Sequence, residues 1–363
     1  MSPIIDRLKR EIRAAKDPSL RAELSACLAG SLARAGRFEE SRQLLDDLRT
    51  NFGITGDSRV SVRIILAEGI RHYYGGCSLE ALDRLSRAQL LAVGMRDDVT
   101  VAQASAWKAQ LEFEVCAFDS MAKSLTLARS RAAPTNHDAW ARLAILLSAA
   151  FEFCGDREQA QHWFIRAHEE AVSGGDLASI EALQHNRAAF RISTLFVEQC
   201  FGDIDAELRD RIRIEIGSAI GMQALTGVEV LTNEIELAKA RYLILDGRYA
   251  DAIDALRAVR DSPPFAIHNF RPELIDLTIG YCQFRCGYAE AALEVCAEVD
   301  DRALEQFDID DRLTAAWMRW FLCLADSRFG DAATMQSQLD RARGAYVEQR
   351  RHLSEILAPF KLP

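Results

Sequence analysis

Residues 246–252 read Asp-Gly-Arg-Tyr-Ala-Asp-Ala, and this stretch decides how the rest of the chain is interpreted. An apolar pattern with helical spacing precedes it, and a second such pattern begins at its tyrosine. The glycine between them suits the left-handed backbone that ends many helices. The stretch therefore predicts a tight turn between two helices. Copies of decreasing similarity lie at residues 35–41, 286–292, 75–81, 154–160, 116–118 and 327–330.

The spacing of these turns is regular. They fall at residues 36, 76, about 116, 155, 247, 287 and about 328, so that most steps are about 40 residues long. The step from 155 to 247 is about twice as long and leaves room for one atypical unit that turns near residues 201–203. A fixed period of this kind is typical of repeat architectures. We therefore predict about eight helix pairs.

Small residues recur at two places around each turn. Two helices pack closely only where their side chains are small. We therefore expect the helices of each pair to cross where these residues meet. The residues seven before a turn are Ala29, Gly69, Ser148, Ala240 and Gly280, and those five after a turn are Ser41, Ala81, Ala160, Ala252 and Ala292.

The turn and the two small positions resemble the tetratricopeptide repeat over about residues 19–345. The period exceeds the usual length of about 34 residues, and the proline that often closes a unit is mostly missing. In this the chain is similar to the divergent repeats of bacterial signalling proteins, such as maltose-regulon activators and sensor modules of diguanylate cyclases. The resemblance implies an all-α, right-handed α-solenoid that binds a partner or effector on its concave face. A generic helical array of other ancestry is the alternative.

The pattern divides this predicted solenoid into five segments. The middle segment is irregular: residues 176–200 predict one long helix, residues 203–216 alternate acids and arginines, and glycines follow at 217, 221 and 227. The glycines predict a hinge or a loop that folds into the groove, and a degenerate unit with a longer connection is the alternative. The segments are an N-terminal capping helix (1–18), repeats 1–4 (19–175), an irregular fifth unit (176–228), repeats 6–8 (229–345) and a C-terminal cap (346–363).

Composition excludes several classes of protein. The 363 residues are 49% hydrophobic, which argues against disorder. No apolar run reaches the ~18 residues of a membrane helix, so we expect no membrane insertion. The net charge of −10 argues against a general nucleic-acid binder. Nine scattered cysteines without a CxxC pair favour a reducing, cytoplasmic compartment, and the excess of arginine over lysine favours a bacterial source.

Motifs of catalysis are missing from the sequence. It contains no P-loop, GxGxxG, GxSxG or HExxH pattern. His162 and His168 are six residues apart and fall on different helix faces. Cys282, Cys286 and Cys296 lack an evident fourth ligand for zinc. We therefore expect no enzyme activity, no metal and no cofactor.

Candidate binding residues lie on the first helix of each pair, which lines the concave face in the implied architecture. Arginine, amide and tyrosine side chains suit a peptide backbone, a terminal carboxylate or an anionic small molecule. Ordinary solvated helix faces with salt bridges are the alternative. The candidates are Arg63, His72, Tyr73, Tyr74, Gln110, Arg142, Glu152, His185, Asn186, Arg187, Arg191 and Arg241.

These residues lead to a functional expectation. We expect a non-catalytic scaffold or adaptor that holds a protein or peptide partner in its groove. A regulatory sensor that binds a small effector or a signalling peptide is the alternative, and the sequence leaves a homodimer open. On the first hypothesis, alanine at Tyr73 and Arg187 should abolish partner capture without unfolding the chain.

Overall fold

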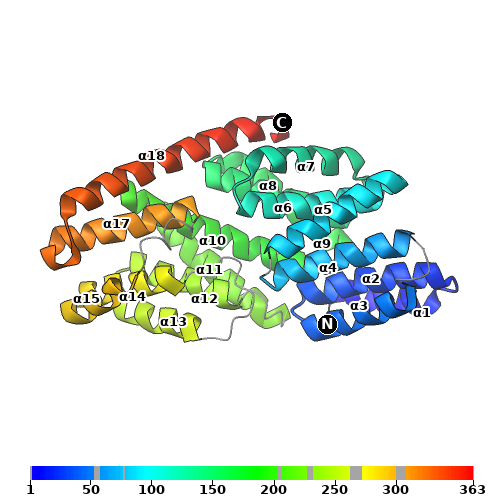
Figure 1. The fold of residues 1–363 in the computed structure, drawn as a ribbon, viewed down its shortest axis with the longest axis horizontal. Helices are drawn as coiled ribbons and strands as arrows, with labels where there is room; N and C mark the ends of the chain where they lie inside the picture. Colours follow the sequence, from blue (N-terminus) through cyan, green and yellow to red (C-terminus); the bar gives the residue numbers. More distant parts are fainter. Residues whose placement is uncertain are drawn as a thin grey trace. The chain divides into compact units, whose positions relative to one another are not determined.

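The computed structural model describes residues 2–52, 58–76, 78–202, 206–226, 232–261, 272–299 and 308–362. Within these ranges the chain forms seventeen α-helices, two short 3-10 turns and no strand (Figure 1). The predicted all-α class is confirmed. No helix in the described part is long and apolar enough to cross a membrane. Predictions that concern Cys77, residues 203–205 and Gly227 lie outside the described residues.

The chain divides into two compact units. The first comprises Met1–Gln184, Gly221–Leu231 and Ile356–Pro363. Its N-terminal helix packs Ile5 and Leu8 against Leu28 and Leu32. The helices of this unit are α1 (Pro3–Ala14), α2 (Pro18–Arg34), α3 (Phe38–Phe52), α4 (Ser58–Tyr74), α5 (Ser78–Met95), α6 (Asp98–Glu114), α7 (Phe118–Arg131), α8 (His137–Cys154) and α9 (Arg157–Gly174).

The second unit comprises His185–Ile220 and Thr232–Glu355. It contains α12 (Thr232–Leu245), α13 (Tyr249–Asp261), α14 (Pro272–Arg285), α15 (Ala289–Ala297), α17 (Ile309–Ala325) and the 3-10 turn η1 (Ser327–Phe329). Three helices contribute residues to both units, namely α10 (Leu177–Phe201), α11 (Ala206–Thr226) and α18 (Ala332–Leu357). The last of these runs without a break through residue 345, where the sequence pattern placed the start of the cap.

Helices that are neighbours in sequence pack together as pairs. In the first unit α2 contacts α3, α4 contacts α5, α6 contacts α7 and α8 contacts α9. The first helices of successive pairs also touch, since α4 contacts both α2 and α6, and α6 contacts α8. In the second unit α12 pairs with α13 and α14 with α15, and α14 contacts α17. This arrangement is what a helical repeat requires.

The predicted turns have the expected backbone. At Gly36 the amide donates to the carbonyl of Ala33 at 3.0 Å and the next amide donates to Leu32 at 2.9 Å, which closes the end of α2. Even the degenerate turn at Cys116 has a left-handed backbone, with a φ of 57°. The glycines with positive φ at the other predicted turns include Gly76, Gly155, Gly202, Gly247 and Gly287.

The small residues mark the helix crossings, as predicted. The Ser41 hydroxyl donates to the Ala29 carbonyl at 2.8 Å, and these residues stand five after and seven before the same turn. The same crossing in another pair joins Ser148 to the Ala160 carbonyl at 3.0 Å. At Gly280 the approach is closer still, because a Cβ there would lie 2.7 Å from the Cys296 Sγ.

The irregular middle is helical. The predicted long helix is present as α10, but the predicted hinge or loop is wrong for residues 217–226, which continue α11. Side chains from the two helices share one apolar cluster, to which α10 contributes Ile192 and Leu195 and α11 contributes Ile212 and Ile216. The two helices therefore share one apolar cluster, and Gly202 after the end of α10 has a positive φ of 91°.

Candidate functional site

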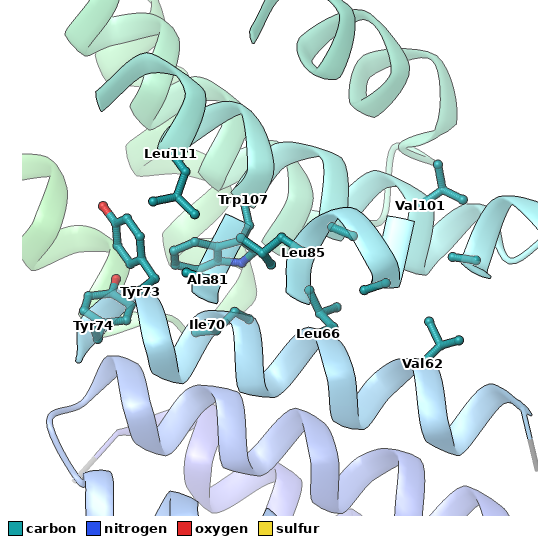
Figure 2. Close-up of a cluster of buried hydrophobic side chains, with 13 residues drawn as sticks. Val62, Leu66, Ile70, Tyr73, Tyr74, Ala81, Leu85, Val101, Trp107 and Leu111 are labelled. Atoms are coloured by element: carbon teal, nitrogen blue, oxygen red, sulfur yellow. The ribbon is translucent and has the colours of Figure 1, made fainter. Parts of the chain in front are cut away.

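An aromatic group lies where α4 and α6 meet in the first unit. The Tyr73 ring lies 5.0 Å from that of Tyr74 and 5.4 Å from that of Trp107, both edge to face. Figure 2 shows the three side chains at one end of the buried cluster that continues along α4 to Val62. Tyr73 is only 7% exposed. Alanine there would leave a cavity, so that variant cannot separate binding from folding.

Arg142 of α8 lies over the same aromatic group. Its Cζ is 3.7 Å from the centre of the Trp107 ring, and the residue is 4% exposed. Among the residues that the structure describes, none accepts a hydrogen bond from its Nε or Nη2. These two nitrogens form one edge of the guanidinium, which can donate two parallel hydrogen bonds to a carboxylate. A buried cation thus has an unused edge that fits an anion.

Polar groups on α6 complete this cluster. The Glu114 Oε1 accepts from the Tyr73 hydroxyl at 2.6 Å and from the Gln110 Nε2 at 3.0 Å. Burial and the neighbouring Glu114 raise the pKa of Tyr73 well above its ordinary value, so the phenol stays protonated and donates. The Gln110 Oε1 is buried and accepts from no described residue. We call Tyr73, Trp107, Gln110, Glu114 and Arg142 the Arg142 cluster.

A second buried cation, Arg34 of α2, ties distant helices together. Its Nη1 donates to Asp138 on α8 at 3.0 Å, and its Nη2 donates to Ser179 at 2.6 Å and to Asp176. Burial disfavours the charge of Arg34, but the two carboxylates outweigh that effect and raise its pKa. The pKa of Asp176 is lowered, because Arg34 and Ser179 outweigh the effect of its own burial. The Arg34 Cζ lies 5.8 Å from the centre of the Trp107 ring.

Arg63 joins the network around Arg34, as a residue of the predicted groove. Its Nη1 donates to the Gln103 Oε1 at 2.5 Å, and the Gln103 Nε2 donates to Asp138 at 3.1 Å. Arg63 and Gln103 are 40 residues apart, and Tyr73 and Glu114 are 41 apart. Both contacts join α4 to α6, so that each spans about one period of the helix pairs and connects one first helix to the next.

A cavity of about 220 Å³ opens beside this network in the first unit. It lies among α1, α8 and α9, where the Ile4 amide donates to the Gly175 carbonyl at 3.2 Å. The His137 Nδ1 is 2.8 Å from the Glu170 Oε2 in its wall. The charged and titratable side chains that line it are Arg7, His137, Asp138, Glu170 and Asp176.

Two other predicted residues of the first unit are also covered. Glu152 is buried on α8. His72 is half-buried at the end of α4, where burial and the neighbouring Arg71 lower its pKa.

The predicted arginines of the second unit are engaged within the fold. Arg187 donates to the Glu215 Oε1 at 3.0 Å, and Arg191 bonds the same oxygen. Arg241 donates to the Asp311 Oδ1 at 2.8 Å. These pairs tie α10 to α11 and α12 to α17, which favours a structural role for the three arginines.

His185 and Asn186 lie on α10 before these arginines. Asn186 is half-buried. His185 is buried, and burial lowers its pKa to about 4, so that its imidazole is neutral at pH 7. Of these two residues of the predicted polar run, only His185 therefore belongs to the packed interior.

Cys200, Cys282 and Cys323 are buried, whereas Cys116 is exposed. Burial raises the pKa of Cys282 to about 12, which keeps the thiol protonated near neutral pH. Cys296 fills the space beside Gly280. In the part of the chain that the structure describes, no group of three or more histidine, cysteine, aspartate or glutamate residues is arranged to hold a metal ion.

No protein-family model matches the chain, and no curated protein matches it. What is shown is an all-helical chain whose helices pack in adjacent pairs.

The residue pattern did not indicate every member of the site, since Glu114 was not among the candidates. It did not single out Arg34, Asp138 or Asp176 as site residues, and it assigned Trp107 to packing. Asp176 carried a signal, because its Oδ1 accepts from the Ser179 amide at 3.2 Å and caps α10, but this pattern indicates a helix start rather than a site. In chemical terms, the Arg142 cluster offers two parallel donors, Nε and Nη2, on a guanidinium whose face is stacked on Trp107.

Proposed function

We propose that this chain is a non-catalytic scaffold or adaptor, a tetratricopeptide-like α-solenoid that binds a protein or peptide partner. The Arg142 cluster is the proposed point of contact, and a carboxylate of the partner is the proposed anchor. The observation that carries the proposal is the free guanidinium edge of Arg142, buried on Trp107. The described cysteines are free thiols, which supports a cytoplasmic location.

The energetics favour an anion at this position. A buried charged group without a hydrogen-bond partner is costly, and each bond to a charged group contributes roughly 1.5–3 kcal/mol. A carboxylate that accepts from both Nε and Nη2 would satisfy this edge of Arg142. Because Arg142 is 4% exposed, the side chains that cover it must move first, and the apparent affinity falls by the fraction of open molecules.

The test compares peptides that differ only at their carboxyl end. A random hexapeptide library with free C-terminal carboxylates, and the same library amidated, would be passed over the immobilised full chain. We expect wild-type protein to retain peptides from the first library and not from the second. Arg142→Met, which keeps an apolar stem on Trp107, should lose them. Arg142→Lys should retain less than wild type because lysine lacks a planar two-donor edge.

A matched control excludes a general effect of charge. Arg42 is half-exposed on α3 and pairs with Glu39 at 2.7 Å and Asp46 at 2.8 Å. The Arg42→Met variant removes the same charge and should bind peptides as wild type does. Equal retention by wild type and a folded Arg142→Met variant would rule out the Arg142 cluster as the anchor.

The cavity favours a second candidate function, that of a sensor for a small effector. Its carboxylates suit an ammonium group and its Arg7 suits a carboxylate, so a small zwitterion fits its lining. A thermal-shift panel of free amino acids would detect such a ligand, since binding to the native state raises the melting temperature. Glu170→Gln should abolish the shift, and a shift that survives the change would place the ligand elsewhere.

A further inference from the structure

The segment that follows α18 lies against α7 and α9 of the first unit. It consists of the 3-10 turn η2 (Ala358–Phe360) and residues Lys361 and Leu362. Figure 1 shows the C-terminal end of the chain beside α7. We call this segment the tail, and it contacts Arg129, Asp156, Gln159 and Trp163 of the first unit.

Side chains of the first unit bind the main chain of the tail. Gln159 uses both ends of its amide, since its Nε2 donates to the Leu362 carbonyl at 2.9 Å and its Oε1 accepts from the Leu362 amide at 2.7 Å. The Trp163 Nε1 donates to the Phe360 carbonyl at 3.1 Å. Contacts of this kind read a peptide backbone whatever its sequence, as in other modes of peptide recognition.

A third donor extends this recognition. The Arg129 Nη1 donates to the Pro359 carbonyl at 3.2 Å, and the Arg129 guanidinium carbon lies 5.1 Å from the centre of the Phe360 ring. Three side chains from two helices therefore satisfy the carbonyls of Pro359, Phe360 and Leu362. They come from α7, which packs against α6, and from α9, which packs against α8. This packing holds the three side chains in fixed positions.

Side chains of the tail supply specificity. Phe360 is 2% exposed, so that its ring is almost wholly removed from water. The Lys361 Nζ lies 2.8 Å from the Asp156 Oδ2, and this hydrogen bond lowers the pKa of Asp156. The other oxygen of Asp156 accepts from the backbone amide of Gln159 at 3.2 Å and caps α9. This hydrogen bond orients the carboxylate independently of the lysine.

We propose that Arg129, Asp156, Gln159 and Trp163 form a peptide-binding site, the tail site, which the chain's own tail occupies. The partner that fits it is a protein segment with the order proline, aromatic, basic, apolar, as in residues 359–362. None of the contacts requires that the segment belong to the same chain. This proposal is independent of the Arg142 cluster, which lies on other helices.

Occupancy by the tail sets the conditions for a partner. A short tether gives the tail an effective concentration of the order of millimolar. A partner segment must therefore compete with the tail, and a change that weakens the tail exposes the site. The tail thus acts as a built-in competitor that raises the concentration of partner needed for binding.

The experiment uses the full chain with a weakened tail. A fluorescein-labelled peptide of residues 357–362 would be titrated with wild type and with the double variant Phe360→Ala, Lys361→Glu, and its anisotropy recorded. We expect saturable binding to the double variant. If the peptide's own Kd is roughly 100 µM, competition by the tail weakens binding to wild type about tenfold.

Two controls define the site. Gln159→Ala in the weakened-tail background should lose the peptide, because it removes both bonds to Leu362. A peptide with Phe360→Ala should not bind. Because Phe360→Ala also removes a buried ring, Lys361→Glu by itself serves as a second background; its lysine is exposed, and circular dichroism checks that both backgrounds fold.

Each contrary result overturns the proposal. No binding to a folded weakened-tail chain would mean that the contacts need covalent attachment. Equal affinity for wild type and variant would mean that the tail does not occupy the site, and binding that survives Gln159→Ala would place the peptide elsewhere. A wild-type dimer by light scattering that Lys361→Glu dissociates would assign the site to the tail of a second copy instead of a separate partner.

Discussion

At the scale of single residues, His185 connects burial to pH. Its imidazole has a pKa of about 4 in the folded chain, against 6.5 when unperturbed, because burial penalises the charged form. The unfolded chain therefore binds more protons than the folded chain between these two pH values. The stability that depends on neutral His185 is complete above pH 6.5 and is lost as the pH falls toward 4.

This gives a measurable prediction. Between about pH 7.5 and pH 5, His185 should account for a loss of about 2 kcal/mol in the free energy of unfolding. Urea titrations of wild type and His185→Asn at both pH values would show a smaller loss in the variant. His352→Asn, at an exposed position on α18, is the matched control and should keep the wild-type dependence. Equal pH dependence in wild type and His185→Asn would refute the burial argument.

The candidate site shows what residue patterns can reveal. Tyr73, Gln110 and Arg142 were predicted because they lie on the first helix of a pair, and they do join one cluster. Their burial was not predicted, because a repeat pattern shows which helix face a residue occupies but not how deep the neighbouring pairs bury it. Arg34 and Asp176 are 142 residues apart, and such a contact depends on packing that no local pattern encodes.

At the scale of helices, glycine has opposite roles at two positions. In α14 a Cβ on Gly280 would lie 2.7 Å from the Cys296 Sγ, whereas Gly344 of α18 has no atom within 4 Å of the same point. Gly280→Ala should therefore lower the free energy of unfolding by about 1–3 kcal/mol, because the added methyl group overpacks the crossing. Gly344→Ala should stabilise by roughly 0.5–1 kcal/mol, since alanine favours helices.

Thermal and urea unfolding would show whether Gly280→Ala lowers the stability and whether Gly344→Ala raises it. Cys296→Ala removes the obstructing sulfur, so the double variant with Gly280→Ala should recover part of the loss. If Gly280→Ala and Gly344→Ala shift the stability in the same direction, the close crossing of α14 and α15 is not what selects glycine.

The α11 helix gives a second prediction at this scale. Gly217 and Gly221 lie inside it, with no atom within 4 Å of an added Cβ at either position. Gly217→Ala should therefore raise the free energy of unfolding by roughly 0.5–1 kcal/mol and increase the helical signal. A hinge at this position would give the reverse, because alanine restricts the backbone. Circular dichroism with urea unfolding distinguishes the two results.

Local patterns explain why most helices were predictable and α11 was not. The turns were found because a left-handed residue and two small residues recur together, as at Gly36 with Ala29 and Ser41. In α11 the alternating acids and arginines make the buried positions Ile212 and Ile216 hard to recognise in the sequence. Glycines are also typical of loops, so glycines inside a helix lead to a wrong prediction of a loop.

At the scale of the whole chain, long-range contacts decide which residues belong to the first unit. Helix repeats bury most of their surface against their neighbours in sequence. Yet Gln159 bonds Leu362 across 203 residues, and Ile4 bonds Gly175. Periodicity predicts the contacts between helices that are neighbours in sequence. It does not predict that the tail, which follows the second unit in sequence, binds the first unit.

This return leads to a prediction for the whole molecule. Deletion from Ala358 onward removes the hydrogen bonds to Arg129, Gln159 and Trp163, all of which lie in the first unit. Amide hydrogen exchange should then quicken in α7 and α9, by about tenfold or more, which corresponds to about 1.4 kcal/mol. The helices α12 to α15 should keep their wild-type rates, because no tail contact described here reaches them. Unchanged exchange in α9, or equal acceleration throughout the chain, would show that the tail does not stabilise the first unit specifically.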